Sequence, residues 1–175
     1  APLNVNNFVF LASENYYNRT RIYRIIPGVL FQGGSRLTLN DDSDDDKFGN
    51  PGYTIQDEIN WNALNISQTK QEILSEEGYE STPNLDSMPV ETYSLAMANG
   101  GPDTNGSQFF IVFGDEDDQR IQYLNGRFTV IGIVTEGREV VDSIANSIIE
   151  DTTTDLARPK DEIRIEEIRI SPSTE

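Results

Sequence analysis

The chain contains no cysteine and no histidine among its 175 residues. Without cysteine there is neither a disulfide framework nor a thiol nucleophile. Without histidine the sequence lacks the usual general base and the commonest metal ligand, and a Ser-His-Asp triad is excluded. Any reaction catalysed by this chain therefore has to rely on other side chains.

Basic residues are also scarce. Thirteen Lys and Arg stand against thirty Asp and Glu, which gives a formal net charge of −17. Such a surface repels phosphate backbones and anionic lipid, so we expect neither nucleic acid nor membrane as a partner. No apolar run approaches the ~18 residues of a membrane span. We expect a soluble protein, cytoplasmic or periplasmic, and the acidic, lysine-poor composition suggests a bacterial source.

The length fits one domain, covering residues 1–175. Helical spacing of apolar residues predicts a helix over residues 4–13 and another over 137–147. A weaker pattern predicts a short helix over 67–75. Runs rich in branched and alternating apolar residues predict strands. These strands are expected at 21–26, 29–32, 93–98, 108–113, 128–135 and 162–170.

Two polar stretches separate the predicted elements. Residues 40–52 form an acidic surface loop, and residues 56–92 form a long insertion with a weak pattern. Asp42, Asp44 and Asp46 alternate as in a calcium-binding loop. However, Lys47 and Tyr53 stand where such a loop needs glycine and glutamate. A solvated acidic loop is therefore the preferred interpretation, and no metal site is predicted.

Three segments could carry chemistry. The first is YRIIPGVLFQGG, residues 23–34, in which Arg24 interrupts an apolar strand; such an arginine either pairs with a carboxylate or faces a cleft. The second is MANGGPDTNGSQFFI, residues 97–111, in which Gly and Asn build consecutive turns before an apolar strand. The third is YLNGRF, residues 123–128, whose Asn-Gly pair on spacing alone is typical of an ordinary hairpin.

Together, and in this order, these segments resemble the cyclophilins, the cyclosporin-binding class of peptidyl-prolyl cis-trans isomerases. The resemblance is strong over residues 1–34 and 93–170 and weak over 40–92. Within that weak region, residues 49–53 look like the family's Gly-rich loop. The resemblance to the cyclophilins implies a mainly β fold, a closed eight-stranded antiparallel barrel capped by two α-helices. The family's first two strands have no counterpart in this sequence, and we expect that residues upstream or another segment supply them.

The resemblance also implies the site. Arg24 corresponds to the catalytic arginine, and Gln32 and Asn99 to the amides that hold the substrate backbone. The remaining substrate-binding positions form the proline pocket and the groove beside it. They are Val29, Leu30, Ala98, Gly100, Gln108, Phe110, Tyr123, Leu124 and Phe128.

Four positions depart from the family pattern. Val29 replaces the pocket phenylalanine, and Phe128 replaces the pocket histidine. Tyr23 replaces a histidine that often precedes the arginine. Tyr123 replaces the tryptophan associated with tight cyclosporin binding. We expect the isomerase activity to remain and cyclosporin affinity to be weakened.

The implied reaction needs no cofactor and no proton transfer. Rotation about an X-Pro bond is opposed by C–N double-bond character. A site that prefers the twisted amide, with Arg24 donating to the prolyl nitrogen, would lower that barrier. The expected partners are proline-containing peptides and unfolded proteins. The alternatives are a non-catalytic module that binds proline peptides, and an adaptor that uses the acidic insertion 56–92 for a protein partner.

Overall fold

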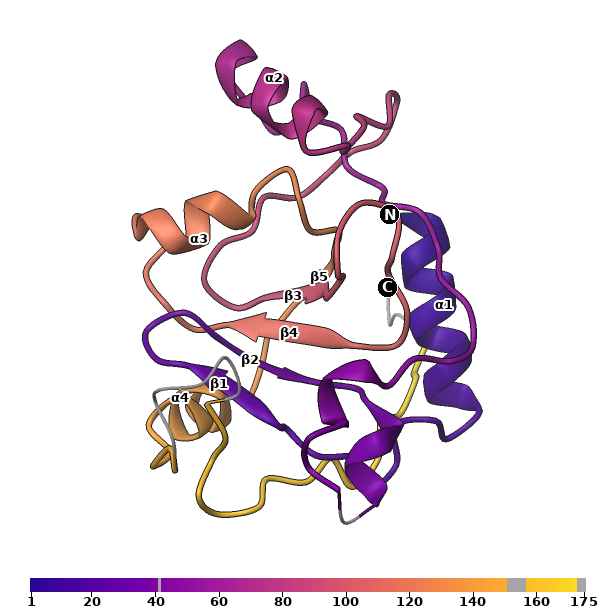
Figure 1. Ribbon diagram of the computed structural model, residues 1–175, viewed down its shortest axis with the longest axis vertical. Coiled ribbons are helices and arrows are strands. Elements are labelled where there is room, and N and C mark those ends of the chain that lie inside the picture. Colours follow the sequence, from indigo (N-terminus) through magenta and orange to yellow (C-terminus); the bar gives the residue numbers. More distant parts are fainter. Residues whose placement is uncertain (41, 151–156, 173–175) are drawn as a thin grey trace.

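The computed structural model describes residues 1–40, 42–150 and 157–172. Their centre is a five-stranded antiparallel sheet with the strand order β1-β2-β4-β3-β5 (Figure 1). The strands are short, and much of the chain lies in the connections between them. Their bounds are β1 Arg24–Ile26, β2 Leu30–Gly33, β3 Ser94–Met97, β4 Phe109–Val112 and β5 Val130–Ile133.

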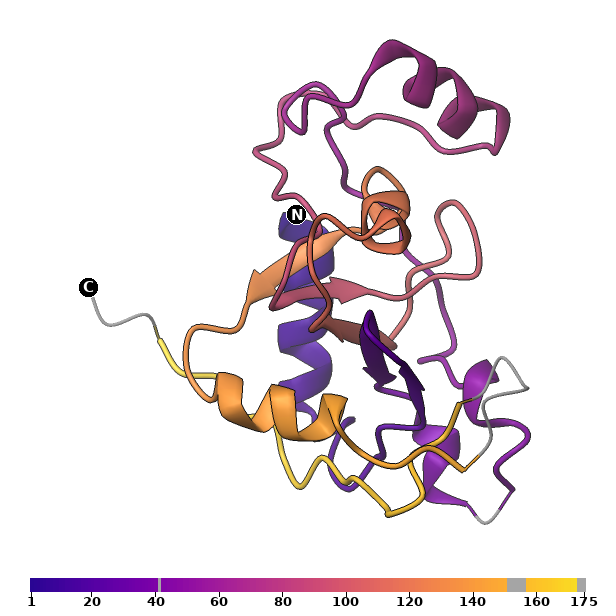
Figure 2. The ribbon, with the colours of Figure 1, turned by 90° about the vertical axis from the view of Figure 1, so that its left-hand side faces the viewer.

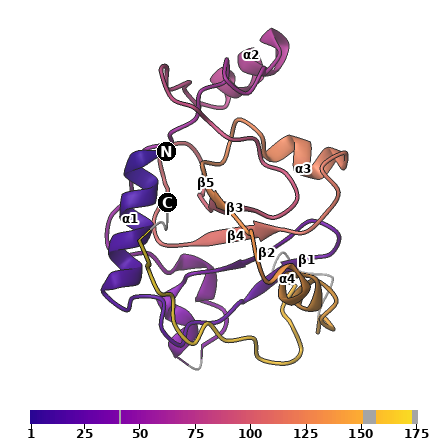
Figure 3. The same cartoon turned by 180° about the vertical axis from the view of Figure 1, so that it is seen from behind.

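The two faces of the sheet bury different clusters, because successive side chains of a strand point to opposite sides. Phe31 and Phe109 face one side, where α1 (Pro2–Ser13) and α4 (Arg138–Ala145) contribute Leu11 and Val141 to the packing. The turned views show α1 and α4 beside the sheet (Figures 2 and 3).

The other face packs against α3 (Gln119–Leu124), which supplies Ile121 and Leu124. Asp118 caps this helix by accepting a hydrogen bond from the backbone N–H of Arg120 at 2.8 Å. This is the face on which the candidate site lies.

Residues 55–92 leave the sheet and return to it, carrying α2 (Gln68–Glu76). Figures 1 and 2 show this excursion projecting beyond α3. It has an apolar cluster of its own, which explains how a mostly polar stretch is ordered. The buried members of that cluster are Ile59, Trp61, Leu74 and Tyr79.

Most predicted elements are confirmed, with shifted ends. The first helix begins two residues earlier than predicted, and the short helix at 67–75 forms as α2 with Ser67 as its N-cap. Five predicted strands form; four are shorter than the apolar run that predicted them, and β2 has the predicted length but lies one residue later. No helix of the described residues is long and apolar enough to cross a membrane.

The predicted strand at 162–170 is wrong. In the structure only Arg164 forms a bridge, with Arg21. The alternation in this segment indicates the side that faces the core, since Ile163 and Ile165 are partly buried and pack against it. Backbone hydrogen bonds accompany this bridge, from Ile165 to the carbonyl of Thr20 at 2.8 Å and from Ile22 to the carbonyl of Ile163 at 2.9 Å. Beyond Ile165 the facing chain turns at Arg19, whose φ is 66°.

The prediction of a closed eight-stranded barrel is also more specific than what the described residues form. The described residues form five strands in an open sheet with β1 and β5 at its edges, and they form four α-helices rather than two. The hairpin interpretation of residues 123–128 is wrong as well. Tyr123 and Leu124 end α3, and Gly126 with φ 89° then turns the chain toward β5.

Candidate active site

Strand register aligns the predicted catalytic residues. Arg24 of β1 lies opposite Gln32 of β2, Gln32 lies opposite Phe110 of β4, and Phe110 lies opposite Ala96 of β3. Residues directly opposite one another in an antiparallel sheet share a face. The sheet therefore places a cation, an amide and an aromatic ring in one row on one face.

Amide side chains fix the polar end of this row. Arg24 Nη1 donates to Gln32 Oε1 at 3.2 Å, and Gln32 Nε2 donates to Tyr23 Oη at 2.6 Å and Gln108 Oε1 at 2.9 Å. Tyr23 in turn donates to Gln108 Oε1. Gln108 Nε2 donates to the carbonyl oxygens of Lys47 at 2.9 Å and Gly49 at 2.7 Å. The acidic loop thus holds Gln108, which holds the residues around Arg24.

Tyr23 is a buried member of this network. Burial raises the pKa of its phenol well above the ordinary value, although nearby Arg24 opposes the shift. The hydroxyl therefore stays protonated across the physiological range, so it both donates to Gln108 and accepts from Gln32. The sequence shows Tyr23 only as a departure from the family pattern and gives no sign of this role.

Replacing Tyr23 with phenylalanine should loosen Gln32 and therefore Arg24. The change removes a donor and an acceptor but leaves the packed ring, so we expect a loss of about 1–2 kcal/mol of unfolding free energy. Turnover of an X-Pro peptide should fall about three- to tenfold, as about 1 kcal/mol of lost positioning implies. Urea unfolding and the exchange rate of the peptide measure the two effects. Unchanged turnover in a destabilised variant would show that Tyr23 only supports the fold.

Apolar residues gather next to Arg24 and Gln32. Phe110 is 2% exposed, and its ring meets that of Phe128 edge-on, with centroids 5.3 Å apart and an interplanar angle of 84°. Phe128 is only partly buried. The other predicted pocket residues belong to the same cluster, so the structure brings them together. They are Val29, Leu30, Ala98 and Leu124.

A buried carboxylate organises the turn-rich segment. Asp57 accepts hydrogen bonds from the backbone N–H of Asp103 at 2.9 Å and from Asn105 Nδ2 at 2.9 Å. Asn99 Nδ2 donates to Asp57 at 3.4 Å and to the carbonyl of Arg127 at 2.9 Å. Burial raises the pKa of Asp57, and these donors counteract the shift. The side chain of Asn99 is thus engaged within the protein, which leaves its main chain as the part able to face a ligand.

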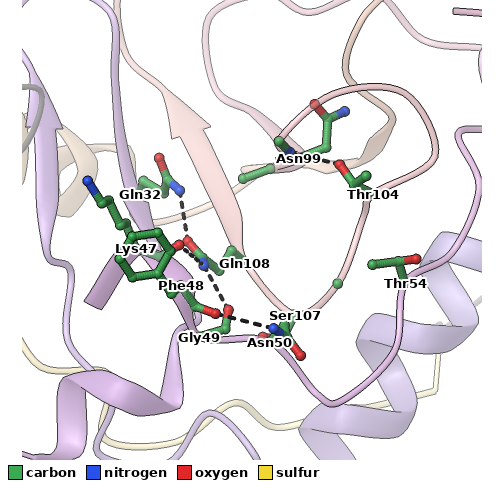
Figure 4. Close-up of a pocket in the computed structure, with 13 residues that line it drawn as sticks. Gln32, Lys47, Phe48, Gly49, Asn50, Thr54, Asn99, Thr104, Ser107 and Gln108 are labelled. Carbon is green, nitrogen blue, oxygen red and sulfur yellow. Dashed lines mark hydrogen bonds between the residues drawn. The ribbon is translucent and has the colours of Figure 1, made fainter. Parts of the chain in front are cut away.

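A cavity of about 310 Å³ opens beside this network (Figure 4). Five of the predicted site residues line this cavity: Gln32, Ala98, Asn99, Gly100 and Gln108. The sequence indicates the segments 49–53 and 97–111 but not which of their residues line the site, and it gives no sign that Lys47, Phe48 or Thr54 does, because a loop's distance from a site cannot be read from spacing. The additional residues that line the cavity are Lys47, Phe48, Gly49, Asn50, Thr54, Thr104, Gly106 and Ser107.

The remaining predicted residues lie outside this cavity. Arg24 adjoins it through its bond to Gln32, and Tyr123 is 56% exposed at the end of α3. Of the three aspartates whose spacing resembles a calcium loop, Asp46 is buried 3.9 Å from Arg158, whereas Asp42 and Asp44 are exposed. Asp41 lies outside the described residues. Among the residues that the structure describes, no group of three His, Cys, Asp or Glu side chains is placed to hold a metal ion.

Comparison with protein families gives one clear match. The family model described as "Cyclophilin type peptidyl-prolyl cis-trans isomerase/CLD" matches residues 1–170. A peptidyl-prolyl cis-trans isomerase B of Bacillus subtilis is 34% identical over 146 residues, covering 83% of this chain and 77% of that protein. The human peptidyl-prolyl cis-trans isomerase-like 1 is 32% identical over 173 residues, covering 99% of this chain and 81% of that protein.

Solved structures agree with this match. A cyclophilin-type isomerase of Cryptosporidium parvum, crystallised in the presence of the dipeptide Ala-Pro, has a TM-score of 0.67 and 26% sequence identity. The similarity covers 98% of this chain and 87% of that one.

Proposed function

Because this chain belongs to the cyclophilin-type peptidyl-prolyl cis-trans isomerases, we propose that it binds proline-containing peptides and unfolded proteins and isomerises their X-Pro bonds at the row formed by Arg24, Gln32 and Phe110. The isomerase activity is that of the family. The residue roles are our proposal, and one observation carries them. A guanidinium held by an amide lies on the same face as an apolar cluster that could hold a proline ring.

The barrier to be lowered is that of amide rotation, ~18–20 kcal/mol. As the bond twists, the prolyl nitrogen becomes pyramidal and gains a lone pair that the planar amide lacks. A donor aimed at that nitrogen bonds the twisted state more strongly than the ground state, which is the condition for catalysis. We assign this donor to Arg24, whose charge is permanent and strengthens the hydrogen bond.

The other residues would prepare this encounter. Gln32 uses both of its amide ends within the protein, so it acts by orienting Arg24 rather than by holding the peptide. Phe110, with Leu124 and Phe128, would anchor the proline ring. The main chain of Asn99 would hold the flanking peptide, so that rotation is confined to one bond. No proton moves, which suits a chain without cysteine and histidine.

Exchange spectroscopy by NMR on a short Ala-Pro peptide tests the proposal, because it needs no coupling protease. The native chain should accelerate cis-trans exchange far above the uncatalysed rate of one event in tens to hundreds of seconds. Cyclosporin added to the same sample should inhibit weakly, since Tyr123 stands where the family has tryptophan. If the peptide resonances shift on binding while exchange keeps its uncatalysed rate, the chain is a proline-peptide binding module instead.

A further inference from the structure

Besides Asp57, which bonds to Asn99, the excursion at 55–92 contacts the surroundings of the candidate site through a buried arginine. Arg127 is 5% exposed, and its Nε and Nη2 each donate to a different carboxylate oxygen of Glu77 at 2.8 Å. Its Nη1 donates to the carbonyl of Tyr123 at 2.8 Å. The guanidinium carbon lies 3.8 Å from the centre of the Tyr123 ring. This side chain thus joins the excursion to the end of α3, where Lys70 Nζ also donates to the carbonyl of Gln122 at 2.6 Å.

The end of α2 aims Glu77 at this arginine. Glu77 is the C-cap residue of α2, and Gly78 follows with φ 91°. The N–H of Tyr79 then bonds to the carbonyl of Leu74 at 2.9 Å, the closing bond of a Schellman turn. Because this turn fixes the backbone on both sides of Glu77, the carboxylate meets the guanidinium in a bidentate pair, which is the strongest geometry for such ions.

Further contacts seat the excursion on the same segment. Trp61 Nε1 donates to the carbonyl of Gly126 at 3.2 Å. Leu74, fully buried, packs so tightly on Gly126 that a Cβ there would lie 2.6 Å from its Cδ1. Apolar packing and the ion pair therefore act on neighbouring residues, and residues 123–128 are braced from outside the sheet.

Arg127 also touches the opposite wall of the site. Its carbonyl accepts the hydrogen bond from Asn99 Nδ2 at 2.9 Å. The same residue therefore sets the ring of Tyr123 through its side chain and the amide of Asn99 through its main chain. Tyr123 is 56% exposed, so without the stacked guanidinium its ring would be free to change rotamer.

The carboxylate of Glu77 keeps the arginine in place. Its hydrogen bonds with Arg127 lower the pKa of Glu77, so it remains ionised at neutral pH. A buried guanidinium that loses its partner carboxylate must find water or another acceptor, and it would move to do so. Losing the charge on Glu77 should therefore release the ring of Tyr123 without disturbing Arg24.

We propose that Glu77 and Arg127 are positioning residues for peptide binding, through which the excursion sets the orientation of Tyr123 and Asn99 toward a proline-containing peptide. This inference rests on the proposed function, because it assumes that the peptide lies between those two residues. It assigns the excursion a part in substrate affinity rather than in the rotation step.

The chain offers a matched pair of variants for the test. Glu77→Gln removes the charge that faces Arg127, and Glu76→Gln removes the exposed neighbouring charge on α2. Arg127→Lys keeps the charge of the arginine but loses its planar fork and its stacking. KM and kcat come from exchange spectroscopy on the Ala-Pro peptide, and Kd from chemical-shift titration. The ring resonances of Tyr123 report its mobility.

We expect Glu77→Gln and Arg127→Lys to raise KM and Kd about three- to tenfold, the effect of losing about 1 kcal/mol of binding. Their kcat should stay within about twofold of the native value, and the Tyr123 ring signals should average. Glu76→Gln should change none of these. A merely structural role would lower the folded fraction, which reduces the apparent kcat and leaves KM unchanged.

Three outcomes separate this inference from the proposed function. Equal KM and Kd in Glu77→Gln and Glu76→Gln would overturn the positioning role while leaving the isomerase intact. A native chain that binds the peptide without catalysis would overturn the proposed function, and the Kd comparison would still decide the positioning role. A native chain that neither binds nor isomerises the peptide would overturn both.

Discussion

Arg24→Ala should lose about 10²- to 10³-fold in kcat while binding the Ala-Pro peptide with a Kd within about threefold of the native value. The expected size of the loss in kcat follows from the role proposed for Arg24. Removing one donor that acts chiefly on the transition state typically costs that much in other enzymes. Binding should survive because the apolar cluster around Phe110 is untouched by the change. Exchange spectroscopy gives the rate, and chemical-shift titration gives Kd.

Two further variants show whether the loss in kcat comes from the guanidinium of Arg24. Arg24→Lys keeps a positive charge but loses the planar fork that bonds Gln32, so we expect an intermediate loss in kcat. Arg169→Ala removes a guanidinium whose side chain is 78% exposed and should leave kcat unchanged. If Arg24→Ala weakens binding and kcat together, Arg24 would be a binding residue, and the donor to the prolyl nitrogen would have to be sought elsewhere.

The sequence predicted the elements of the fold better than their pairing. Apolar spacing located α1, α4 and five strands, because burial on one face is a local property of a strand or helix. Pairing depends on a distant partner, and the segment at 162–170 shows the difference. Ile163, Ile165 and Ile168 are partly buried, as the alternation indicated, yet Ile170 is exposed and only Arg164 forms a bridge.

The helix α3 was missed for a different reason. Its six residues are too few to show a helical period, and Asn125-Gly126 follows them with the signature of a hairpin. A usable signal did exist. Asp118 is a good N-cap residue, and Ile121 and Leu124 are spaced for one buried face.

The residues of the candidate site also fall into those that local sequence predicted and those that it did not. Motifs carried by the resemblance located Arg24, Gln32 and Phe110, and strand register aligns them in the structure. The wall at 47–50 and the clamp between Glu77 and Arg127 come from loops and from the excursion. Their contacts cross 50 residues or more of chain, and no local pattern encodes which loop meets which.

Phe110→Ala should weaken peptide binding about ten- to hundredfold, the second large effect that we expect. A proline ring that packs on this side chain would lose about 1.5–3 kcal/mol of apolar contact, and each 1.4 kcal/mol is a factor of ten in Kd. The same change empties a position that is only 2% exposed, so the unfolding free energy should fall by about 3–5 kcal/mol. Titration at low temperature, where the variant stays folded, measures Kd, and urea unfolding measures stability.

The neighbouring residue on β4 separates these two effects. Phe109 is equally aromatic and is 5% exposed, but it faces α1, where its ring meets those of Phe8 and Tyr17 edge-on. Phe109→Ala should therefore destabilise the fold by a similar amount and leave Kd for the peptide unchanged in the folded protein. If both variants weaken binding equally, the loss would follow from a disturbed sheet, and Phe110 would not be the floor of a proline pocket. If only Phe110→Ala weakens it, the alternation of side chains along one strand separates a residue that binds from one that only supports.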